Sequence, residues 1–121
     1  MLLPEYCQHF ANKLKNETIE DFVGLDTEGR AKKMLAIINK HHIRFTALRI
    51  FAVVFIYHIN SRKGPTHEEI LGILENKEIK NKREINYALY HHLASSGITK
   101  EQSKRFVLTQ TFLSRLDSKP T

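Results

Sequence analysis

The sequence predicts a mostly helical protein with one small β-hairpin near its C-terminal end. Apolar residues recur every three or four positions along most of the 121-residue chain, which is the period of amphipathic helices. Only 5 Gly and 3 Pro are present, which is few for the many tight turns of an all-β protein. Two short segments, residues 98–101 and 105–109, flank a turn at residues 102–104 and predict the hairpin.

The composition is that of one globular domain with a basic surface. Hydrophobic residues make up 41% and charged residues 26%, which argues against a disordered chain. Lys and Arg number 19 against 13 Asp and Glu, giving a formal net charge of +6. This charge favours an anionic partner, but it does not by itself choose between DNA, RNA and an acidic membrane surface.

The single cysteine and the hydropathy pattern indicate a cytoplasmic protein with no membrane partner. Cys7 alone excludes an intrachain disulfide and a zinc site of several thiolates, in agreement with a reducing compartment. Residues 1–5 lack the basic and apolar segments of a secretory signal. The most apolar run, residues 51–59, is too short to cross a bilayer.

Residues 1–44 are predicted to form an N-terminal helical extension. One helix is expected over residues 5–15, a short turn over 18–23 that Gly24 ends, and a second helix from Asp26 or Thr27 to about 42. Their apolar stripes could pack on the rest of the chain or on a second subunit, and we expect a homodimerisation region. The stripes are formed by Tyr6, Phe10, Leu14, Met34, Leu35 and Ile38.

The next helix, beginning at Thr46, is apolar on all sides and is therefore expected at the centre of the fold. A Gly-Pro break follows at residues 61–65. Thr66 and Glu69 then form a capping-box pattern at the start of a short helix with Ile70 to Leu74.

A further helix is predicted over residues 81–95, followed by Gly97 as its stop. At 100° per residue, one face carries an apolar set that should be buried. The opposite face carries a cation, an amide and two phenols. The buried set is Ile85, Ala88, Leu89, His92 and Leu93, and the outward set is Arg83, Asn86, Tyr87 and Tyr90. A last helix over residues 111–116 and a loose tail over 118–121 complete the chain.

The order helix, helix, turn, helix, hairpin, helix over residues 45–117 is the plan of a winged helix-turn-helix domain. In such a domain the helix at 81–95 would enter the major groove of duplex DNA, and the hairpin would approach the backbone beside it. Residues 77–105 carry seven Lys or Arg and three Glu, a difference of +4. The predicted DNA-contacting residues are Lys80, Lys82, Arg83, Asn86, Tyr87, Tyr90, Lys100, Lys104 and Arg105.

Residues 43–116 resemble the DNA-binding core of MarR-type winged-helix transcription regulators. Residues 43–49 (IRFTALR) resemble the start of their framework helix, and residues 93–98 (LASSGI) the passage from recognition helix to wing. Residues 105–109 (RFVLT) resemble the return strand of the wing. The resemblance implies a homodimer that reads a pseudo-palindromic operator. The family has a longer wing and C-terminal dimerisation helices, so here a dimer would rest mainly on residues before 45.

The predicted function is therefore sequence-specific binding of double-stranded DNA by a homodimeric transcription regulator. Two alternatives stay open: a winged-helix module for protein–protein interaction, and a plasmid or phage replication or partition factor. No catalytic set, phosphate-binding loop or metal-ligand spacing is visible, so neither an enzyme nor a cofactor or metal is expected. The adjacent pairs His41-His42 and His91-His92 point about 100° apart on a helix and are poorly placed to chelate.

Overall fold

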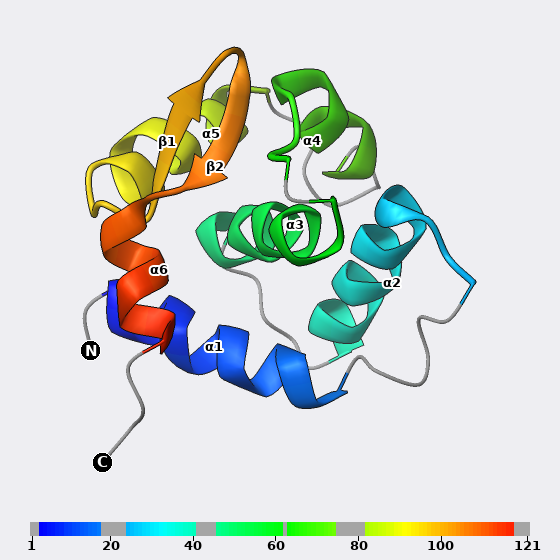
Figure 1. Ribbon diagram of the computed structural model, residues 1–121. Coiled ribbons are helices and arrows are strands. Elements are labelled where there is room, and N and C mark those ends of the chain that lie inside the picture. The colour runs from blue at the N-terminus through cyan, green and yellow to red at the C-terminus, as the bar shows by residue number, and fades with distance from the viewer. Residues whose placement is uncertain (1–2, 18–23, 41–45, 62, 75–81, 118–121) are drawn as a thin grey trace.

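The structure, a computed structural model, describes residues 3–17, 24–40, 46–61, 63–74 and 82–117. It is mostly helical, with one antiparallel two-stranded hairpin, as the sequence predicts (Figure 1). The elements are α1 (Leu3–Glu17), α2 (Thr27–Lys40), α3 (Thr46–Ser61), α4 (His67–Leu74), α5 (Lys82–Tyr87), the π-helix η1 (Ala88–Ala94), β1 (Thr99–Gln102), β2 (Arg105–Leu108) and α6 (Gln110–Asp117). The turn expected at residues 18–23, the connection at 76–80 and the tail at 118–121 lie outside the described residues.

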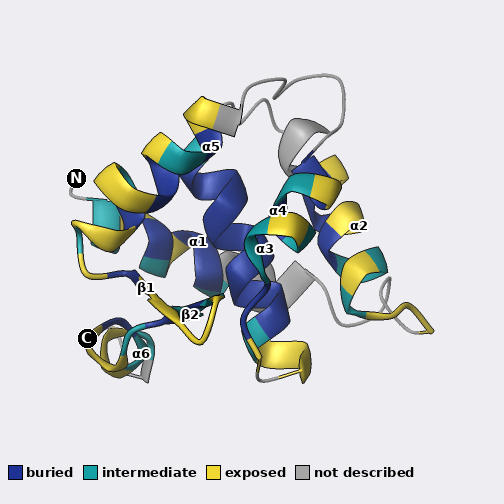
Figure 2. Cartoon of the chain, turned by 90° about the horizontal axis from the view of Figure 1, so that it is seen from above, coloured by how far each residue is buried: buried dark blue, intermediate teal, exposed yellow. Residues whose placement is uncertain are grey.

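Helix α3 forms the centre of the molecule, as its apolar sides predict. Every residue from Ala47 to Tyr57 is buried, and the other elements surround the helix (Figure 1; Figure 2). Phe51 stacks on Phe55 with ring centroids 5.8 Å apart, and it also packs edge-on against Phe112 of α6 at 5.4 Å. A helix buried on all sides gives the other elements a common surface on which to pack.

The N-terminal helices pack on α3 and belong to the same hydrophobic core as the rest of the chain. Phe10, Met34 and Leu35 are buried in this way, so these three side chains of the predicted dimerisation stripes are used within the subunit. Tyr6 is 50% exposed. The side chains of Leu14 and Ile38 lie outside the part described. Asp26 caps α2 by accepting a hydrogen bond of 2.7 Å from the Gly29 amide.

The hairpin has a shorter turn than the sequence predicted. Its strands pair from Thr99↔Leu108 to Gln102↔Arg105, so the turn has two central residues, Ser103 and Lys104, and residue 102 belongs to β1. Both turn residues have positive φ, 52° and 66°. This is the type I′ geometry that matches the twist of antiparallel strands and that Asn-Gly adopts most readily. Since neither residue is Asn or Gly, this short turn has no strong signal in the sequence.

Replacing the turn with Asn-Gly (Ser103→Asn with Lys104→Gly) should raise the free energy of unfolding by about 1 kcal/mol. The left-handed conformation costs an ordinary residue about that much, and Gly avoids the cost. Urea denaturation of the variant and the parent measures the difference. Lys104→Val is the opposing variant, because a β-branched residue at positive φ should destabilise the protein. The type I′ assignment is contradicted if the two variants change stability in the same direction.

No helix in the described part of the chain is long and apolar enough to span a membrane.

Candidate nucleic-acid interface

The candidate recognition helix, predicted over residues 81–95, is one continuous helix made of two successive segments: the α-helix α5 and the π-helix η1. It covers residues 82–94, close to the predicted 81–95. Its second half is a π-helix, which the 3.6-residue pattern did not predict. Gly97, with φ 73°, ends it. The Ile98 amide donates to the Leu93 carbonyl at 3.0 Å and the Gly97 amide to Ala94 at 3.0 Å, which is the Schellman arrangement.

The predicted division of this helix into a buried and an outward face is confirmed except at His92, expected on the buried face, and Asn86, expected on the outward face, which are both half-buried. The apolar residues Ile85, Ala88, Leu89 and Leu93 are each no more than 3% exposed and pack toward α3. Tyr87 is 55% exposed and Tyr90 is 46% exposed, and Arg83 is exposed on the same helix. Two large aromatic side chains are thus held at the surface by a rigid helix. Such residues are available to a partner.

The π-helical turn changes what surrounds Tyr87. Its ring stacks on His91 with centroids 4.7 Å apart and meets His92 edge-on at 5.1 Å. Residues five apart on an α-helix point about 140° away from each other, so an α-helix would separate Tyr87 from His92. The wider π turn brings residue i+5 above residue i. The two histidines therefore belong to the surface beside Tyr87, a grouping that the sequence analysis missed.

Tyr90 connects the helix to the hairpin. Its hydroxyl donates a hydrogen bond of 2.9 Å to Glu101 Oε2 on β1, and its ring lies edge-on to Phe106 of β2 at 6.0 Å. Burial and the Glu101 carboxylate raise the pKa of the Tyr90 phenol. The hydroxyl is thus occupied within the subunit, and the exposed part of Tyr90 offers chiefly a ring edge and face.

Asn86 is also engaged within the subunit. Its Oδ1 accepts a hydrogen bond of 2.5 Å from Nε2 of His67, at the start of α4. This contact joins the start of α4 to α5, and it requires the His67 tautomer that carries its proton on Nε2. The Asn86 side chain is half-buried. A base pair would have to be read by its remaining amide hydrogens.

The hairpin is fixed to the body of the protein by the segment that follows α3. The Phe106 amide donates to the Pro65 carbonyl at 2.9 Å, and Thr66 forms an antiparallel bridge with Arg105. Gly64 lies so close to β2 that a Cβ on it would fall 1.9 Å from the Phe106 carbonyl oxygen. A glycine is required here because of this close approach of two backbones.

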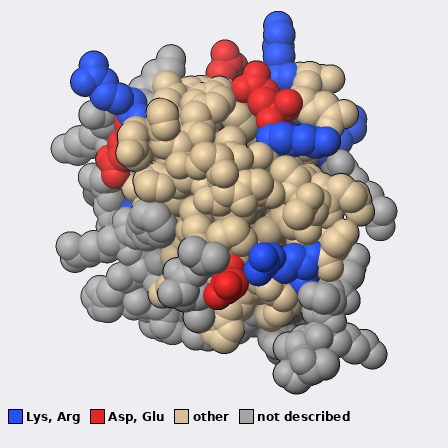
Figure 3. Space-filling model, turned by 90° about the vertical axis from the view of Figure 1, so that its left-hand side faces the viewer, with Lys and Arg blue, Asp and Glu red and all other residues tan. Residues whose placement is uncertain are grey.

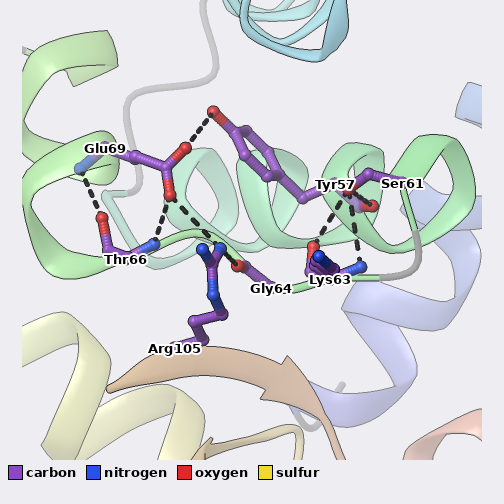
Figure 4. Close-up of polar contacts among 7 residues, drawn as sticks. All are labelled: Tyr57, Ser61, Lys63, Gly64, Thr66, Glu69 and Arg105. Carbon is purple, nitrogen blue, oxygen red and sulfur yellow. Dashed lines mark hydrogen bonds and ion pairs between the residues drawn. The ribbon is translucent and has the colours of Figure 1, made fainter. Parts of the chain in front are cut away.

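Glu69 joins α3, α4 and the hairpin through one carboxylate (Figure 4). The predicted capping box is confirmed: the Glu69 amide donates to Thr66 Oγ1 at 3.1 Å, and Glu69 Oε1 accepts from the Thr66 amide at 3.0 Å. Glu69 Oε2 accepts from the Tyr57 hydroxyl at 3.3 Å. Arg105 Nη1 lies 3.5 Å from Glu69 Oε1 and donates to the Gly64 carbonyl at 2.8 Å.

Tyr57 should make the stability of the protein depend on pH in the alkaline range. Burial and then the Glu69 carboxylate raise the pKa of Tyr57 from 10.0 to about 12. Below pH 10 the Tyr57 phenol is neutral in both the folded and the unfolded protein, and its full contribution to the free energy of unfolding is present. As the pH rises through 12 the stabilisation is lost, because the unfolded chain releases the proton first. The stability advantage of the parent over Tyr57→Phe should therefore shrink between pH 9 and 12 in chemical denaturation. An advantage constant across that range would contradict the assignment.

The predicted contact residues divide into three groups in the structure. Lys80 and the side chain of Lys82 lie outside the described residues. Arg83, Tyr87, Tyr90, Lys100 and Lys104 are exposed. Asn86 and Arg105 have partners inside the subunit, His67 for the first and Gly64 with Glu69 for the second. The structure thus brings together an outward helix face and a hairpin with two exposed lysines.

The face seen in Figure 3 is on the side where α5, the hairpin and α6 lie in Figure 1. It is uncharged over most of its centre, and Lys, Arg, Asp and Glu side chains lie around this uncharged area. Between residues 77 and 105, the side chains described include four Lys or Arg (83, 100, 104 and 105) and two Glu (84 and 101), a difference of +2. A partner on this face would therefore meet uncharged groups at the centre and charges of both signs around them.

The described residues contain no group of three or more His, Cys, Asp or Glu placed to hold a metal ion. Cys7 is buried on α1, and burial raises the pKa of its thiol to about 12, so its thiolate is disfavoured at neutral pH.

Comparison with known proteins gives no match to a family model, to a curated protein or to a solved structure.

Proposed function

We propose that this chain is a cytoplasmic, winged-helix protein that binds double-stranded DNA through the outward face of residues 82–94, and that it regulates transcription without catalytic activity. The observation that carries the proposal is the exposure of Tyr87 and Tyr90 on a helix whose other face is buried against α3. The resemblance of residues 43–116 to MarR-type regulators supports the same reading.

The distribution of groups on this face suits the two kinds of contact that DNA recognition uses. Phosphate contacts position a protein on the duplex, and base contacts specify the sequence. Lys100 and Lys104 on the hairpin are exposed cations beside the helix and fit the first role. Arg83 and Tyr87 on the helix fit the second, since Arg pairs with guanine and an aromatic ring contacts the thymine methyl.

A homodimer is part of the proposal because one short winged helix reaches few phosphates by itself. Phe10, Met34 and Leu35 are buried within the subunit, so the interface must use other residues of α1 and α2. The half-exposed Tyr6 of α1 is a candidate. A dimer with twofold symmetry predicts two chains per duplex on a pseudo-palindromic site.

The test is the affinity of the purified protein for duplexes selected from a random pool, measured by fluorescence anisotropy. Arg83→Ala should weaken binding by about 1–3 kcal/mol and relax the preference for one base pair. Lys32→Ala is the matched control: it also removes one exposed cation, but from α2, on the other side of α3. The parent should bind with a steep salt dependence and a stoichiometry of two chains per duplex.

If the parent, Arg83→Ala and Lys32→Ala bound duplexes with equal affinity, Arg83 would not be a DNA-contacting residue. An absence of binding to any selected duplex at low salt would reject the DNA-binding proposal. The uncharged centre of the face in Figure 3 favours a protein partner as the second candidate. Exposed tyrosines are frequent anchors of protein interfaces.

A further inference from the structure

A groove about 430 Å³ in volume lies between the end of α3, the segment at residues 63–64, the hairpin and the start of α6. Its lining includes four basic side chains, His58, Lys63, Lys100 and Arg105. None of the described residues that line it carries a carboxylate. A volume of this size is within the range of small-molecule sites.

The pleat of the hairpin concentrates the cations on the groove side. Alternate residues of a strand point to opposite faces, so Lys100 and Gln102 share the face that their partners Val107 and Arg105 also occupy. All four line the groove. Glu101, the acidic residue of β1, pairs with Phe106 on the other face and accepts the hydrogen bond of Tyr90 there.

The two lysines and the arginine of the groove, Lys63, Lys100 and Arg105, differ in how firmly other residues hold them. Arg105 is fixed by Gly64 and Glu69, and both contacts use the single nitrogen Nη1. Its remaining guanidinium N–H groups stay suitable for an oxyanion. Among the described side chains, no carboxylate forms an ion pair with Lys63 or Lys100. An anion in the groove would therefore meet two lysines that form no ion pair with a described carboxylate.

Neutral donors complete the lining. Gln102, Ser103 and Gln110 line the same groove and can donate hydrogen bonds. Gln110 is also the first residue of α6, so the N-terminal end of that helix, where the helix dipole is positive, lies beside the groove. Val54 and Val107 provide an apolar wall on the inner side.

We propose that this groove is a phosphoryl-binding site, in which Lys63, Lys100 and Arg105 hold the phosphate oxygens. Lys and Arg with a few neutral donors are the groups that bind phosphate most strongly in proteins. The phosphoryl group has two possible sources: a small phosphorylated metabolite that enters the groove, or a phosphodiester of bound DNA. The site does not depend on DNA binding, because the first source needs no DNA.

The test is a titration of the protein with inorganic phosphate and with pyrophosphate, followed by backbone amide shifts in NMR spectra. Sodium chloride of equal ionic strength is the reference. Shifts should be largest near Gln102, Ser103 and Gln110. The double variant Lys63→Gln/Lys100→Gln should raise the apparent dissociation constant about tenfold or more. The matched control Lys32→Gln/Lys33→Gln removes two exposed lysines of α2 that do not line the groove and should leave phosphate binding within about twofold of the parent.

Equal phosphate affinity in all three proteins, or shifts that chloride reproduces, would overturn the site. Adding a selected duplex identifies the source: displacement of phosphate assigns the groove to a DNA phosphodiester, and retention assigns it to a metabolite. Arg83→Ala separates this site from the proposed function, because it should weaken duplex binding and leave phosphate binding unchanged.

Discussion

Gly64→Ala is expected to destabilise the protein by about 3 kcal/mol, because Gly64 has the closest backbone approach of the five glycines. The added Cβ would lie 1.9 Å from the carbonyl oxygen and 2.6 Å from the carbonyl carbon of Phe106. Both atoms belong to the backbone of a paired strand and cannot rotate away. The Phe106 amide also donates to Pro65, so moving β2 outward breaks that hydrogen bond. Overpacking of this kind costs about 1–3 kcal/mol or more.

Urea denaturation of Gly64→Ala and of Gly72→Ala measures this effect against a matched control. Gly72 is an exposed helical glycine, and a Cβ added to it would meet nothing within 4 Å. Ala at that position should stabilise α4 by up to about 1 kcal/mol, because Ala has the higher helix propensity. Opposite signs for the same Gly→Ala change are expected. A Gly64→Ala variant as stable as the parent would show that the segment after α3 does not lie against the hairpin.

Glu69→Ala is expected to destabilise the protein by about 2 kcal/mol. The substitution removes the acceptor of the Thr66 amide, the acceptor of the Tyr57 hydroxyl and the ion partner of Arg105. Loss of a capping interaction costs about 1 kcal/mol, and a neutral hydrogen bond contributes about the same. The ion pair adds little, since both side chains are about 40% exposed.

Glu69→Gln and Glu68→Ala separate these contributions in the same denaturation experiment. Gln keeps an oxygen that can accept from Thr66 or Tyr57, so Glu69→Gln should cost less than about 1 kcal/mol. Glu68 is exposed in the same first turn, and Glu68→Ala should cost only the weak interaction with the helix dipole, about 0.5 kcal/mol. If Glu69→Ala were no worse than Glu68→Ala, the carboxylate would not join α3, α4 and the hairpin.

Much of this architecture follows from local patterns in the sequence. The apolar sides of residues 47–57 place α3 at the centre, and the Thr66–Glu69 spacing specifies the capping box. The positions of Ile85, Leu89 and Leu93 identify the buried face of the candidate recognition helix and so the outward position of Tyr87. In each case the determining residues lie within a few positions of one another, where helix geometry relates sequence to space directly.

Features that depend on distant backbone contacts could not be predicted. The contacts of Arg105 with Gly64 and Glu69 join residues about forty positions apart, and no local sequence pattern indicates them.

The π-helical turn at Ala88–Ala94 is local, but the sequence did not predict it either. It leaves the apolar period nearly intact, so the 3.6-residue pattern looks the same with or without it. The wider turn of η1 nonetheless brings His92 into contact with Tyr87.

The proposed function requires that the outward face of residues 82–94 contacts duplex DNA. The most direct measurement is the map of backbone amide shifts when the protein is titrated with a selected duplex at moderate salt. If this face binds DNA, the largest shifts should cluster at Arg83, Tyr87 and His91 and on the hairpin at Lys100 and Lys104. Shifts confined to α1 and α2, or no shifts at any duplex concentration, would contradict it.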